Sequence, residues 1–444
     1  MDILLVNYSD SLGGAARAAL RNHCSLLEHG PSYGLYSRLR VIKKYSDVPA
    51  VVGGWPIGQS KIWRRMHPRL TLLARRGFYS ENLTPHSIAW PATGLGTELQ
   101  HYHSQGKADL VNLHWLGDDT LSIEEIGRLK MPLVWTLHDQ WPFCGAEHYT
   151  NPHIPIESDS SNERFALGYT PGSRSKHESG PDLNQRTWQR KLRAWRRPGR
   201  NPIRIVCLSS WMADCVRRSV LMADWPIHVI PNPIDLQVWE PFDQRQARKL
   251  LQLPHDRPLV LFGAHGGTHD PRKGGDLLLE ALSYIRARVV GTSLDQLELV
   301  VFGQGPPLNP PNLGFPIHYK GMLHDDLSLR LLYAAADLFV IPSRQDNLPN
   351  TGLEAHACGL PVVAFRTGGL VDIVEDKATG ALAEPFDPAS LAHAICWVLE
   401  DPQRRHRLGV AARQRAERLW DPARVVGLYA EVFRQAMEGS VHSF

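Results

Sequence analysis

Short apolar runs recur along this chain, and most are followed by polar residues and then by a helical pattern. In the first half the runs lie at 2–8, 110–114, 133–137 and 203–208. A second series lies at 258–263, 299–303, 337–341 and 361–365. Short runs rich in Val, Ile and Leu are typical of parallel strands that are buried on both faces. The pattern therefore predicts two α/β halves in tandem, each with its own parallel sheet.

Helical patterns between these runs set the expected domain boundaries. They lie at 15–27, 275–286, 325–336, 352–358, 404–420 and 423–437. A proline-punctuated turn at 229–235 indicates a change of domain. We expect an N-terminal domain over 1–232, a linker over 233–256 and a C-terminal domain over 257–420. Residues 150–185 are rich in Pro, Ser, Gly and charge, which predicts a flexible surface loop.

The composition is that of an ordinary globular protein. The chain has 444 residues, and its 49 Lys and Arg against 45 Asp and Glu give a net charge of +4, which does not indicate nucleic-acid binding. Its six cysteines are scattered and form no C-x-x-C pair, which argues against a zinc site and a disulfide framework. The N-terminal apolar run is short and has no basic region before it, and no apolar run reaches the length of a membrane span. We therefore expect a cytoplasmic protein.

The strongest local signal is the polar loop that follows Ile341. It joins a predicted strand to a helix that starts near Thr351, and unpaired N–H groups at a helix start favour a bound phosphate. Asp346 and Glu354 bracket the loop and can accept hydrogen bonds from sugar hydroxyls. A second interpretation stays open, because Thr351 and Glu354 also have the spacing of a capping box, which would serve only the helix.

The stretch from Asp346 to Ala364 resembles glycosyltransferase family 4. Members carry two acids separated by seven residues, followed by a run close to EAHACGLPVVA, which this chain has at 354–364. Asp346 stands where many members have Glu. The resemblance implies that Asp346 contacts the donor sugar and Glu354 the nucleotide ribose. It also implies that the loop between them holds the donor near its phosphates, through Asn347, Leu348, Pro349, Asn350 and Thr351.

A pair of cations, Arg272 and Lys273, is similar to the family's basic diphosphate clamp. The resemblance implies that they neutralise the leaving diphosphate, whereas the other interpretation is a surface pair that opens a helix. The arginine common in the family just after the first glycine of this segment is replaced by Ala264, and Arg272 is expected to take its role. Further similarities imply donor contacts at Gly13, Gly14, Gly303, Lys320, Gly321 and Met322.

His138 and Asp139 directly follow the predicted strand at 133–137. They resemble the family's T-x-HD position, which implies contact with the transferred sugar near the reacting carbon. The alternative is a hydrogen-bonded histidine at a strand end. The residues after them resemble a subgroup active in polysaccharide assembly, whose members often carry several cysteines in the next loop. This chain keeps only Cys144, so we expect no metal there.

The family resemblance implies a GT-B fold, in which two Rossmann-like doubly wound domains face a central cleft. The C-terminal helix over 421–444 is expected to cross back to the N-terminal domain. The implied reaction is retaining transfer of a hexose-type sugar, from a UDP- or GDP-linked donor to a saccharide or lipid-linked saccharide. The expected setting is exopolysaccharide, capsule or lipopolysaccharide biosynthesis.

The expected mechanism is front-face attack, because no carboxylate is identified as a nucleophile for a double displacement. No D-x-D motif stands in a convincing context, since Asp118–Asp119 and Asp325–Asp326 lie near predicted helix starts, where acids favour the helix dipole. Neither a metal nor a cofactor is expected, because GT-B enzymes generally use basic residues and the nucleotide sugar is a substrate.

The segment 61–76 mixes basic, apolar and aromatic residues, and Pro68 is expected to interrupt a helix there. The segment is either a peripheral contact with an anionic inner-membrane surface or a solvated basic face. Two other functions also stay open. The chain is either a GT-B-like sugar-nucleotide epimerase or a non-catalytic nucleotide-sugar-binding partner. A dehydrogenase is disfavoured because the dinucleotide fingerprint is absent.

Overall fold

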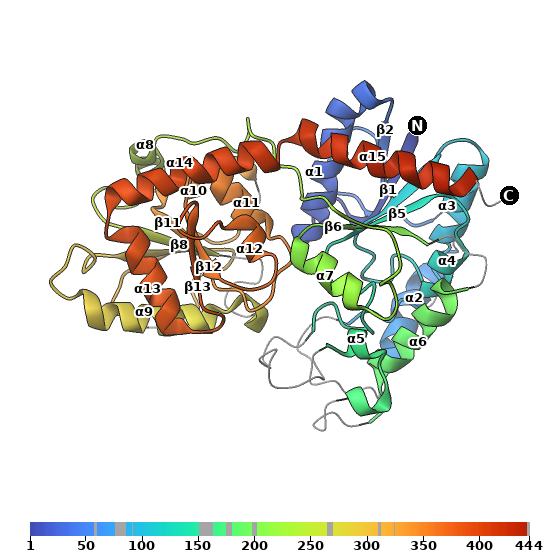
Figure 1. Ribbon diagram of the computed structural model, residues 1–444, viewed down its shortest axis with the longest axis horizontal. Coiled ribbons are helices and arrows are strands. Elements are labelled where there is room, and N and C mark those ends of the chain that lie inside the picture. Colours follow the sequence, from blue (N-terminus) through green and yellow to red (C-terminus); the bar gives the residue numbers. More distant parts are fainter. Residues whose placement is uncertain are drawn as a thin grey trace. The chain divides into compact units, whose positions relative to one another are not determined.

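The computed structural model describes residues 1–56, 60–75, 86–90, 92–150, 163–174, 180–197, 202–263, 270–309, 312–323 and 325–441. The chain forms two compact units (Figure 1). The first contains Met1–Pro231 together with Val425–Phe444, and the second contains Asn232–Arg424. The segment 233–256, expected as a linker, belongs to the second unit and includes helix α8, Gln244–Leu250.

The first unit is built on a parallel sheet whose strand order is β3-β2-β1-β4-β5-β6-β7. Its strands are β1 Asp2–Ser9, β2 Tyr36–Lys43, β3 Val51–Gly53, β4 Leu110–Leu113, β5 Leu133–Leu137, β6 Arg204–Cys207 and β7 Ile227–Val229. Its helices are α1 Gly13–His29, η1 Gly30–Tyr33, α2 Lys61–Arg75, α3 Leu95–Ser104, α4 Ile123–Arg128, α5 Arg164–Leu167, η3 Pro171–Ser173, α6 Leu183–Trp195, α7 Ser210–Arg218 and, at the end of the chain, α15 Pro422–Val441.

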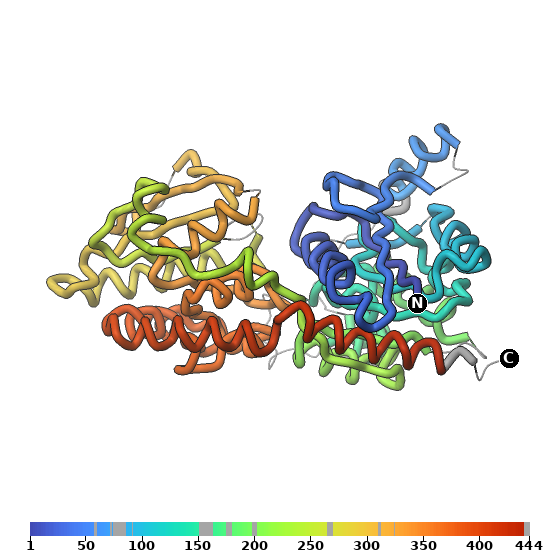
Figure 2. The backbone as a smooth tube through the Cα atoms, turned by 90° about the horizontal axis from the view of Figure 1, so that it is seen from above, coloured from blue at the N-terminus to red at the C-terminus, as the bar shows by residue number. Residues whose placement is uncertain are grey.

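The last helix, α15, completes the core of the first unit. Val425, Tyr429 and Phe433 are buried in one apolar cluster with Leu5 of β1 and Leu26 of α1. Figures 1 and 2 show α15, in red, running along this unit. The chain thus leaves the first unit at Pro231 and returns to it at Val425.

The second unit is built on a parallel sheet in the order β10-β9-β8-β11-β12-β13. Its strands are β8 Leu259–Gly263, β9 Glu298–Phe302, β10 Ile317–Tyr319, β11 Leu338–Ile341, β12 Val362–Phe365 and β13 Gly380–Ala383. Its other helices are η5 Pro271–Lys273, α9 Gly275–Val289, α10 Asp326–Ala335, α11 Asn350–Ala357, α12 Leu370–Ile373, α13 Pro388–Leu399 and α14 Pro402–Leu419.

Both sheets reverse their strand order near the centre, and this determines where side chains can converge. In the second unit the order runs one way from β8 to β9 and the other way to β11, and in the first unit it divides in the same way at β1 and β4. Doubly wound sheets bind ligands outside the carboxyl ends of the strands at such switch points. Ligand-binding side chains are therefore expected in the loops after β8 and β11 of the second unit and after β1 and β4 of the first.

Two local predictions are wrong. Pro68 lies inside α2, because proline fits the helical φ and removes only one backbone hydrogen bond. Asp118 and Asp119 have positive φ and lie in a turn before α4, which begins at Ile123, so they do not start a helix. By contrast, Asp325 caps α10 through the Ser328 N–H, as expected for an acid at a helix start.

The predicted surface loop at 150–185 is partly a packed region. Residues 151–162 and 175–179 lie outside the described residues. The described remainder contains α5 and η3, and the side chains of Phe165 and Tyr169 are buried in the core of the first unit. Among the described residues, no helix is both long and apolar enough to cross a membrane.

Candidate functional site

The ends of β8 and β11 are brought together by a glycine. Gly274 follows η5 with φ +66°, and a Cβ built there would lie 1.9 Å from the carbonyl oxygen of Pro342. Only glycine permits both this conformation and this approach. The Arg344 N–H donates to the Arg272 carbonyl at 2.8 Å, and the Arg344 guanidinium pairs with Asp276 at 2.5 Å. These contacts fix η5 against the loop that follows β11.

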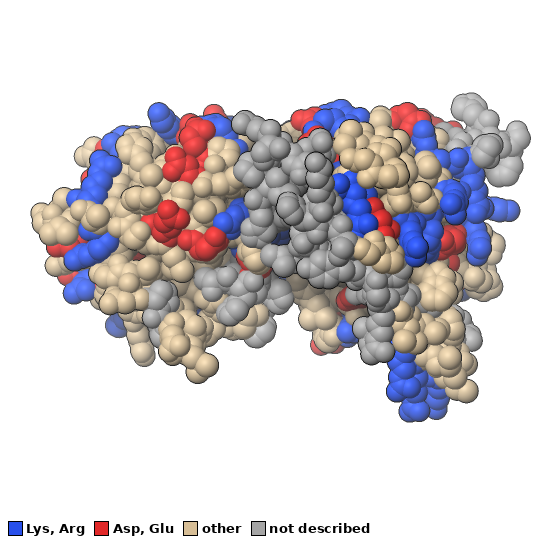
Figure 3. Space-filling model, turned by 90° about the horizontal axis from the view of Figure 1, so that it is seen from below, with Lys and Arg blue, Asp and Glu red and all other residues tan. Residues whose placement is uncertain are grey.

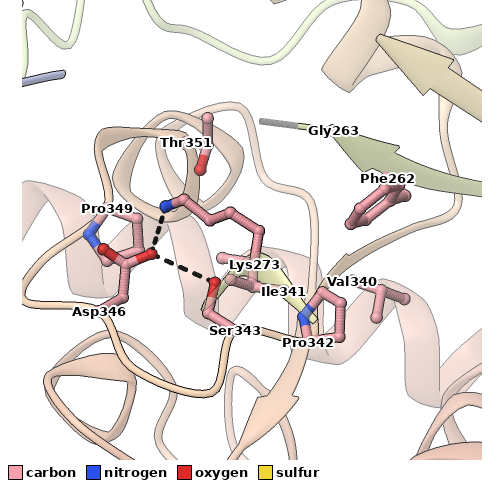
Figure 4. Close-up of a pocket in the computed structure, with 10 residues that line it drawn as sticks. All are labelled: Phe262, Gly263, Lys273, Val340, Ile341, Pro342, Ser343, Asp346, Pro349 and Thr351. Atoms are coloured by element: carbon pink, nitrogen blue, oxygen red, sulfur yellow. Dashed lines mark hydrogen bonds and ion pairs between the residues drawn. The ribbon is translucent and has the colours of Figure 1, made fainter. Parts of the chain in front are cut away.

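A polar pocket forms at this junction and is called here the Lys273 pocket (Figure 4). Lys273 Nζ lies 2.6 Å from Asp346 Oδ2, and Ser343 Oγ donates to the same oxygen at 3.2 Å. Arg272 lies beside the pocket, with its Nη1 atom 3.5 Å from Asp346 Oδ1. The lining residues are Phe262, Gly263, Lys273, Val340, Ile341, Pro342, Ser343, Asp346, Pro349 and Thr351.

The two charges at the pocket stabilise each other. Burial raises the pKa of Asp346, but Lys273 and Arg272 outweigh it and the net pKa is lowered. Burial lowers the pKa of Lys273, and the Asp346 carboxylate opposes that change. Asp346 is therefore ionised at neutral pH, and its charge favours the protonated form of Lys273. A cation held this way at a switch point can bind a phosphate or diphosphate.

Helix α11 begins at the edge of the Lys273 pocket, and it begins two residues earlier than the capping-box interpretation requires. Pro349 is its N-cap, and no side chain caps the helix. Thr351 therefore lies inside the first turn, where its side chain lines the pocket (Figure 4). Glu354 Oε2 instead accepts a hydrogen bond from Tyr333 Oη of α10 at 3.0 Å. The capping box is wrong, and the buried Glu354 is not among the pocket's lining residues.

Of the predicted donor loop, Pro349 and Thr351 line the pocket, whereas the other three residues do not. The side chains of Asn347 and Leu348 are buried, and Asn350 Oδ1 accepts a hydrogen bond from Asn232 Nδ2 at 3.2 Å. Of the two predicted clamp cations, Lys273 lines the pocket, whereas Arg272 donates to the Gln345 carbonyl at 2.9 Å. Arg272 therefore supports the loop from which Asp346 projects.

The other donor contacts predicted in the second unit lie at the β9 and β10 ends and do not line the Lys273 pocket. The Gly303 N–H donates to the Gly321 carbonyl at 2.8 Å. Lys320 Nζ donates to the Leu251 carbonyl at 2.7 Å, and the Met322 side chain is exposed. In the first unit, Gly13 is the first residue of α1 and has φ +84°, a backbone conformation that favours glycine, and Gly14 follows it in the helix.

A second pocket, called here the histidine pocket, lies in the first unit at the ends of β4 and β5. His138 Nε2 lies 2.9 Å from Nδ1 of His114, and the two rings are stacked with centroids 5.2 Å apart. Burial lowers the pKa of His138 to about 4, with Asp139 opposing, so His138 is neutral at pH 7. The lining residues are His114, Trp115, Leu116, Gly117, Trp135, His138, Asp139, Trp141, Pro142 and His148.

Asp139 is held by its neighbours. Its Oδ2 accepts from Trp115 Nε1 at 2.7 Å and lies 2.6 Å from His148 Nδ1, while its Oδ1 accepts the Trp141 N–H at 3.0 Å. Burial raises the pKa of Asp139, but these partners, His148 first, outweigh it and the pKa is lowered. Asp139 therefore fixes the wall of the histidine pocket, beside His138.

The buried Lys191 stabilises the loop 141–145, which follows His138 and Asp139 in the chain. Lys191 Nζ donates to the carbonyl groups of Trp141, Cys144 and Gly145 and lies 3.9 Å from the centroid of the Trp141 ring. Burial lowers the pKa of Lys191 to about 7. Within the described part of the chain, no three His, Cys, Asp or Glu side chains are grouped so as to hold a metal ion.

Several residues of the two pockets were not predicted as site residues: Ser343 and Tyr333, which bond the two acids, and His114, Trp115 and His148 around His138 and Asp139. A signal for His114 and Trp115 was available. His114 is the last residue of the predicted strand 110–114 and Trp115 directly follows it, which is close to the rule that identified His138 and Asp139 after the strand 133–137. His148 could not be found in this way, because it is reached through a loop.

Two family models match the chain. One is described as Glycosyltransferase Family 4 and matches residues 65–238, and the other as Glycosyl transferases group 1 and matches residues 258–401. Each therefore covers most of one unit. The second match contains Arg272, Lys273, Asp346 and Glu354, and the first contains His138.

The chain is also similar to curated proteins described as D-inositol 3-phosphate glycosyltransferases. It is 34% identical to that of Xylanimonas cellulosilytica over 227 residues, which are 47% of this chain and 51% of the relative. It is 34% identical to D-inositol 3-phosphate glycosyltransferase 1 of Catenulispora acidiphila over 230 residues, which are 48% of this chain and 52% of the relative. The chain thus spans about half the length of the curated relatives it matches.

Solved structures resemble nearly the whole chain. Sucrose-phosphate synthase from Thermosynechococcus elongatus matches with a TM-score of 0.64 at 18% identity, over 98% of both chains. HepE of Anabaena in complex with UDP-glucose matches with a TM-score of 0.61 at 19% identity, over 98% of this chain and 100% of HepE. At these identities the likeness shows the fold alone, and it confirms the expected GT-B class with two Rossmann-like sheets.

Proposed function

The chain belongs to glycosyltransferase family 4, and from this premise we propose that it transfers a sugar from a nucleotide-sugar donor to an acceptor hydroxyl. The donor is a UDP- or GDP-linked hexose, and UDP-glucose, which HepE binds, is the first to test. The acceptor is a saccharide or lipid-linked saccharide in exopolysaccharide, capsule or lipopolysaccharide biosynthesis. One similar structure, WaaG, is described as a glycosyltransferase of lipopolysaccharide biosynthesis, which supports this choice.

The observation that carries the proposal is the Lys273–Asp346 pair, 2.6 Å apart in a pocket at a strand-order switch point. In the proposed complex, Lys273 holds the diphosphate with the backbone N–H groups at the start of α11. Asp346 accepts a hydroxyl of the donor sugar, and Glu354, oriented by Tyr333, accepts from the ribose. His138 contacts the transferred sugar as a neutral hydrogen-bonding group.

The proposed reaction retains the anomeric configuration through front-face attack. The acceptor oxygen bonds to the anomeric carbon on the face from which the diphosphate leaves, and the bond between that carbon and the phosphate oxygen breaks. The acceptor proton passes to the departing phosphate. Lys273 stabilises the negative charge that grows on the phosphate, so no metal is needed and chelation with EDTA leaves the rate unchanged.

The test is transfer from a panel of nucleotide sugars by the wild-type chain and by Lys273→Ala. We expect kcat to fall by roughly 100-fold or more in the variant, the scale for losing one preorganised charge-stabilising group. The exposed Lys249 of α8, changed to Ala, is the matched control and keeps the wild-type rate. A Lys273→Ala rate equal to wild type would remove the clamp from the mechanism.

The same assay separates the proposed function from its alternatives. Product anomers are assigned by NMR, and an inverted linkage would contradict retention. An epimerised donor without acceptor would identify an epimerase. Donor binding without transfer across a broad acceptor panel would identify a non-catalytic binding partner.

We also propose that α2 places the protein on the anionic inner face of the plasma membrane. Ile62, Met66 and Leu73 are 70%, 44% and 56% exposed, and their spacing puts them on one side of the helix. Exposed basic residues lie beside this stripe at Lys61, Arg65 and Arg69. Figure 3 shows a group of Lys and Arg side chains on a projecting edge of the first unit. Arg76 lies outside the described residues.

Co-sedimentation with vesicles tests this attachment. We expect binding to anionic vesicles, weaker binding to neutral ones, and loss of binding when Ile62 is changed to Asp. The exposed Leu250 of α8, changed to Asp, is the control and keeps binding. Equal sedimentation with both vesicle types would show that the segment is a solvated basic face.

A further inference from the structure

A continuous chain of buried hydrogen bonds runs from α15 to His138. Tyr429 Oη lies 3.2 Å from Thr136 Oγ1, which donates to Asn112 Oδ1 at 3.1 Å. Asn112 Nδ2 lies 3.2 Å from His114 Nε2, and His114 Nδ1 lies 2.9 Å from His138 Nε2. The chain crosses the centre of the sheet through β4 and β5, and all of its residues belong to the first unit.

The donors in this chain all point the same way. Because Thr136 gives its only hydroxyl proton to Asn112 Oδ1, the Tyr429 hydroxyl must donate to Thr136. The Asn112 amide nitrogen can only donate, so His114 Nε2 is the acceptor. A neutral histidine that accepts at Nε2 carries its proton at Nδ1, so His114 donates to Nε2 of His138.

The electrostatics of His114 agree with this direction. Burial and the neighbouring His138 hold the pKa of His114 well below its usual value, so His114 is neutral and has a single N–H to give. With its one N–H committed, His114 leaves His138 no freedom to carry a proton at Nε2.

We propose that His114 is a positioning residue that fixes His138 as the Nδ1–H tautomer, so that His138 meets the transferred sugar as a hydrogen-bond donor through Nδ1. The role of His138 in transfer rests on the proposed function, whereas the tautomer does not. Fixing a tautomer through the other ring nitrogen removes a proton rearrangement from the reaction, as preorganised donors generally do.

The first experiment reads the tautomer without any substrate. Nitrogen-15 NMR of histidine-labelled full-length protein at pH 7, with His138→Gln to assign the signals, is expected to show a protonated Nδ1 and an unprotonated Nε2 for His138. A protonated Nε2 would mean that every donor in the chain points the other way, and it would overturn the proposal.

The second experiment uses three variants of the chain. His114→Leu has no donor and is expected to give a mixture of His138 tautomers and a kcat lower by roughly 100-fold, with KM for the donor changed far less. His114→Asn places an amide N–H where Nδ1 stood and is expected to restore both the tautomer and most of the rate. Thr136→Val breaks the chain two bonds away and is expected to shift the tautomer in the same direction as His114→Leu.

Controls separate this inference from the proposed function. His103→Asn, at a histidine of the same unit that bonds the Ala108 carbonyl, is expected to change neither readout. If His114→Leu altered the tautomer but not kcat, the positioning role would be overturned. If wild-type protein transferred no sugar from any donor, the proposed function would fail, while the NMR result would still decide the tautomer.

Discussion

At the residue scale, the buried polar groups of both pockets are held by partners. The Asp346 carboxylate has Lys273 and Ser343, and the Asp139 carboxylate has Trp115 and His148. A buried charge is costly unless it is paired and hydrogen-bonded, so removal of one partner costs more than the pair itself contributes. Single substitutions at these partners are therefore sensitive tests of the site.

Tyr333 is the clearest example in the second unit. Changing Tyr333 to Phe removes the donor to Glu354 Oε2 and leaves a buried carboxylate with one hydrogen bond fewer. We expect unfolding in urea to require about 1–3 kcal/mol less free energy. We also expect weaker binding of the donor nucleotide, measured by calorimetry, because Glu354 loses its orientation.

Tyr284→Phe is the matched control, since that side chain is 49% exposed on α9 of the same unit. It should stay within about 0.5 kcal/mol of wild type. Loss of stability in Tyr333→Phe without weaker nucleotide binding would separate Glu354 from the donor site.

Burial of His356 makes the stability of the second unit depend on pH. This side chain is fully buried, stacks on Trp420, and has its pKa lowered to about 3 by burial first and by Arg415 second. The folded chain therefore excludes a proton that the unfolded chain binds below pH 6.5. Stability contributed by this histidine is full above pH 6.5 and is lost as the pH falls toward 3, by about 2 kcal/mol at pH 5.

His356→Phe keeps the ring stack and removes the titration. We expect the variant to lose less stability than wild type between pH 7 and pH 5, the difference being about 2 kcal/mol in free energies of unfolding of the second unit. Parallel curves for the two proteins would contradict the assignment.

At the element scale, the sequence predicted the central strands well and the helix starts less well. The run at 133–137 is β5, and those at 258–263 and 361–365 match β8 and β12 to within a residue. These strands are buried on both faces, so hydrophobicity alone marks them. The start of α11 could not be predicted because two signals compete, a capping box at Thr351 and a proline N-cap at Pro349.

The candidate sites were predicted only where a residue follows a strand. Lys273, Asp346 and His138 come from loops after β8, β11 and β5, and two of them meet in one pocket. The partners Tyr333 and His148 come from α10 and from a distant part of a loop. Their positions depend on tertiary packing, which no local pattern of residues records.

Gly274 tests how far the Lys273 pocket depends on the junction between η5 and β11. In Gly274→Ala the new Cβ would lie 1.9 Å from the Pro342 carbonyl oxygen, so one element must move. Gly291 also has positive φ, +78°, but a Cβ there meets nothing within 4 Å. We expect Gly291→Ala to cost about 1 kcal/mol, the strain of the left-handed conformation alone.

Gly274→Ala should cost at least about 2 kcal/mol, because the clash adds to the same strain. It should also lower transfer activity, since Lys273 is the preceding residue. Denaturant unfolding and the transfer assay measure the two effects. Equal costs for the two alanine variants would show that η5 moves freely and that its contact with β11 does not hold the pocket.

At the scale of the whole molecule, the chain builds its first unit from both of its ends. Residues 1–231 supply the sheet. Helix α15, which follows the second unit in the sequence, packs its apolar side chains against that sheet. The amphipathic pattern at 423–437 predicted a helix, but a pattern does not say which sheet a helix covers. That follows from the contacts of Val425, Tyr429 and Phe433 with Leu5 and Leu26.

The substitution Phe433→Ala measures how much the packing of α15 contributes to the stability of the first unit. The Phe433 side chain is fully buried, so Phe433→Ala should cost about 3–5 kcal/mol through lost burial and the cavity left behind. The loss should be confined to the unit that α15 completes. Hydrogen exchange should therefore rise in β1, β2 and α1 and stay at the wild-type level in β8, β11 and α9, and a thermal shift on donor binding at the Lys273 pocket should persist.

Leu428→Ala, at a 38% exposed position of the same helix, should leave exchange in both units nearly unchanged. Faster exchange in β8 and β11 of Phe433→Ala would instead mean that the two units unfold together and that α15 stabilises the entire chain.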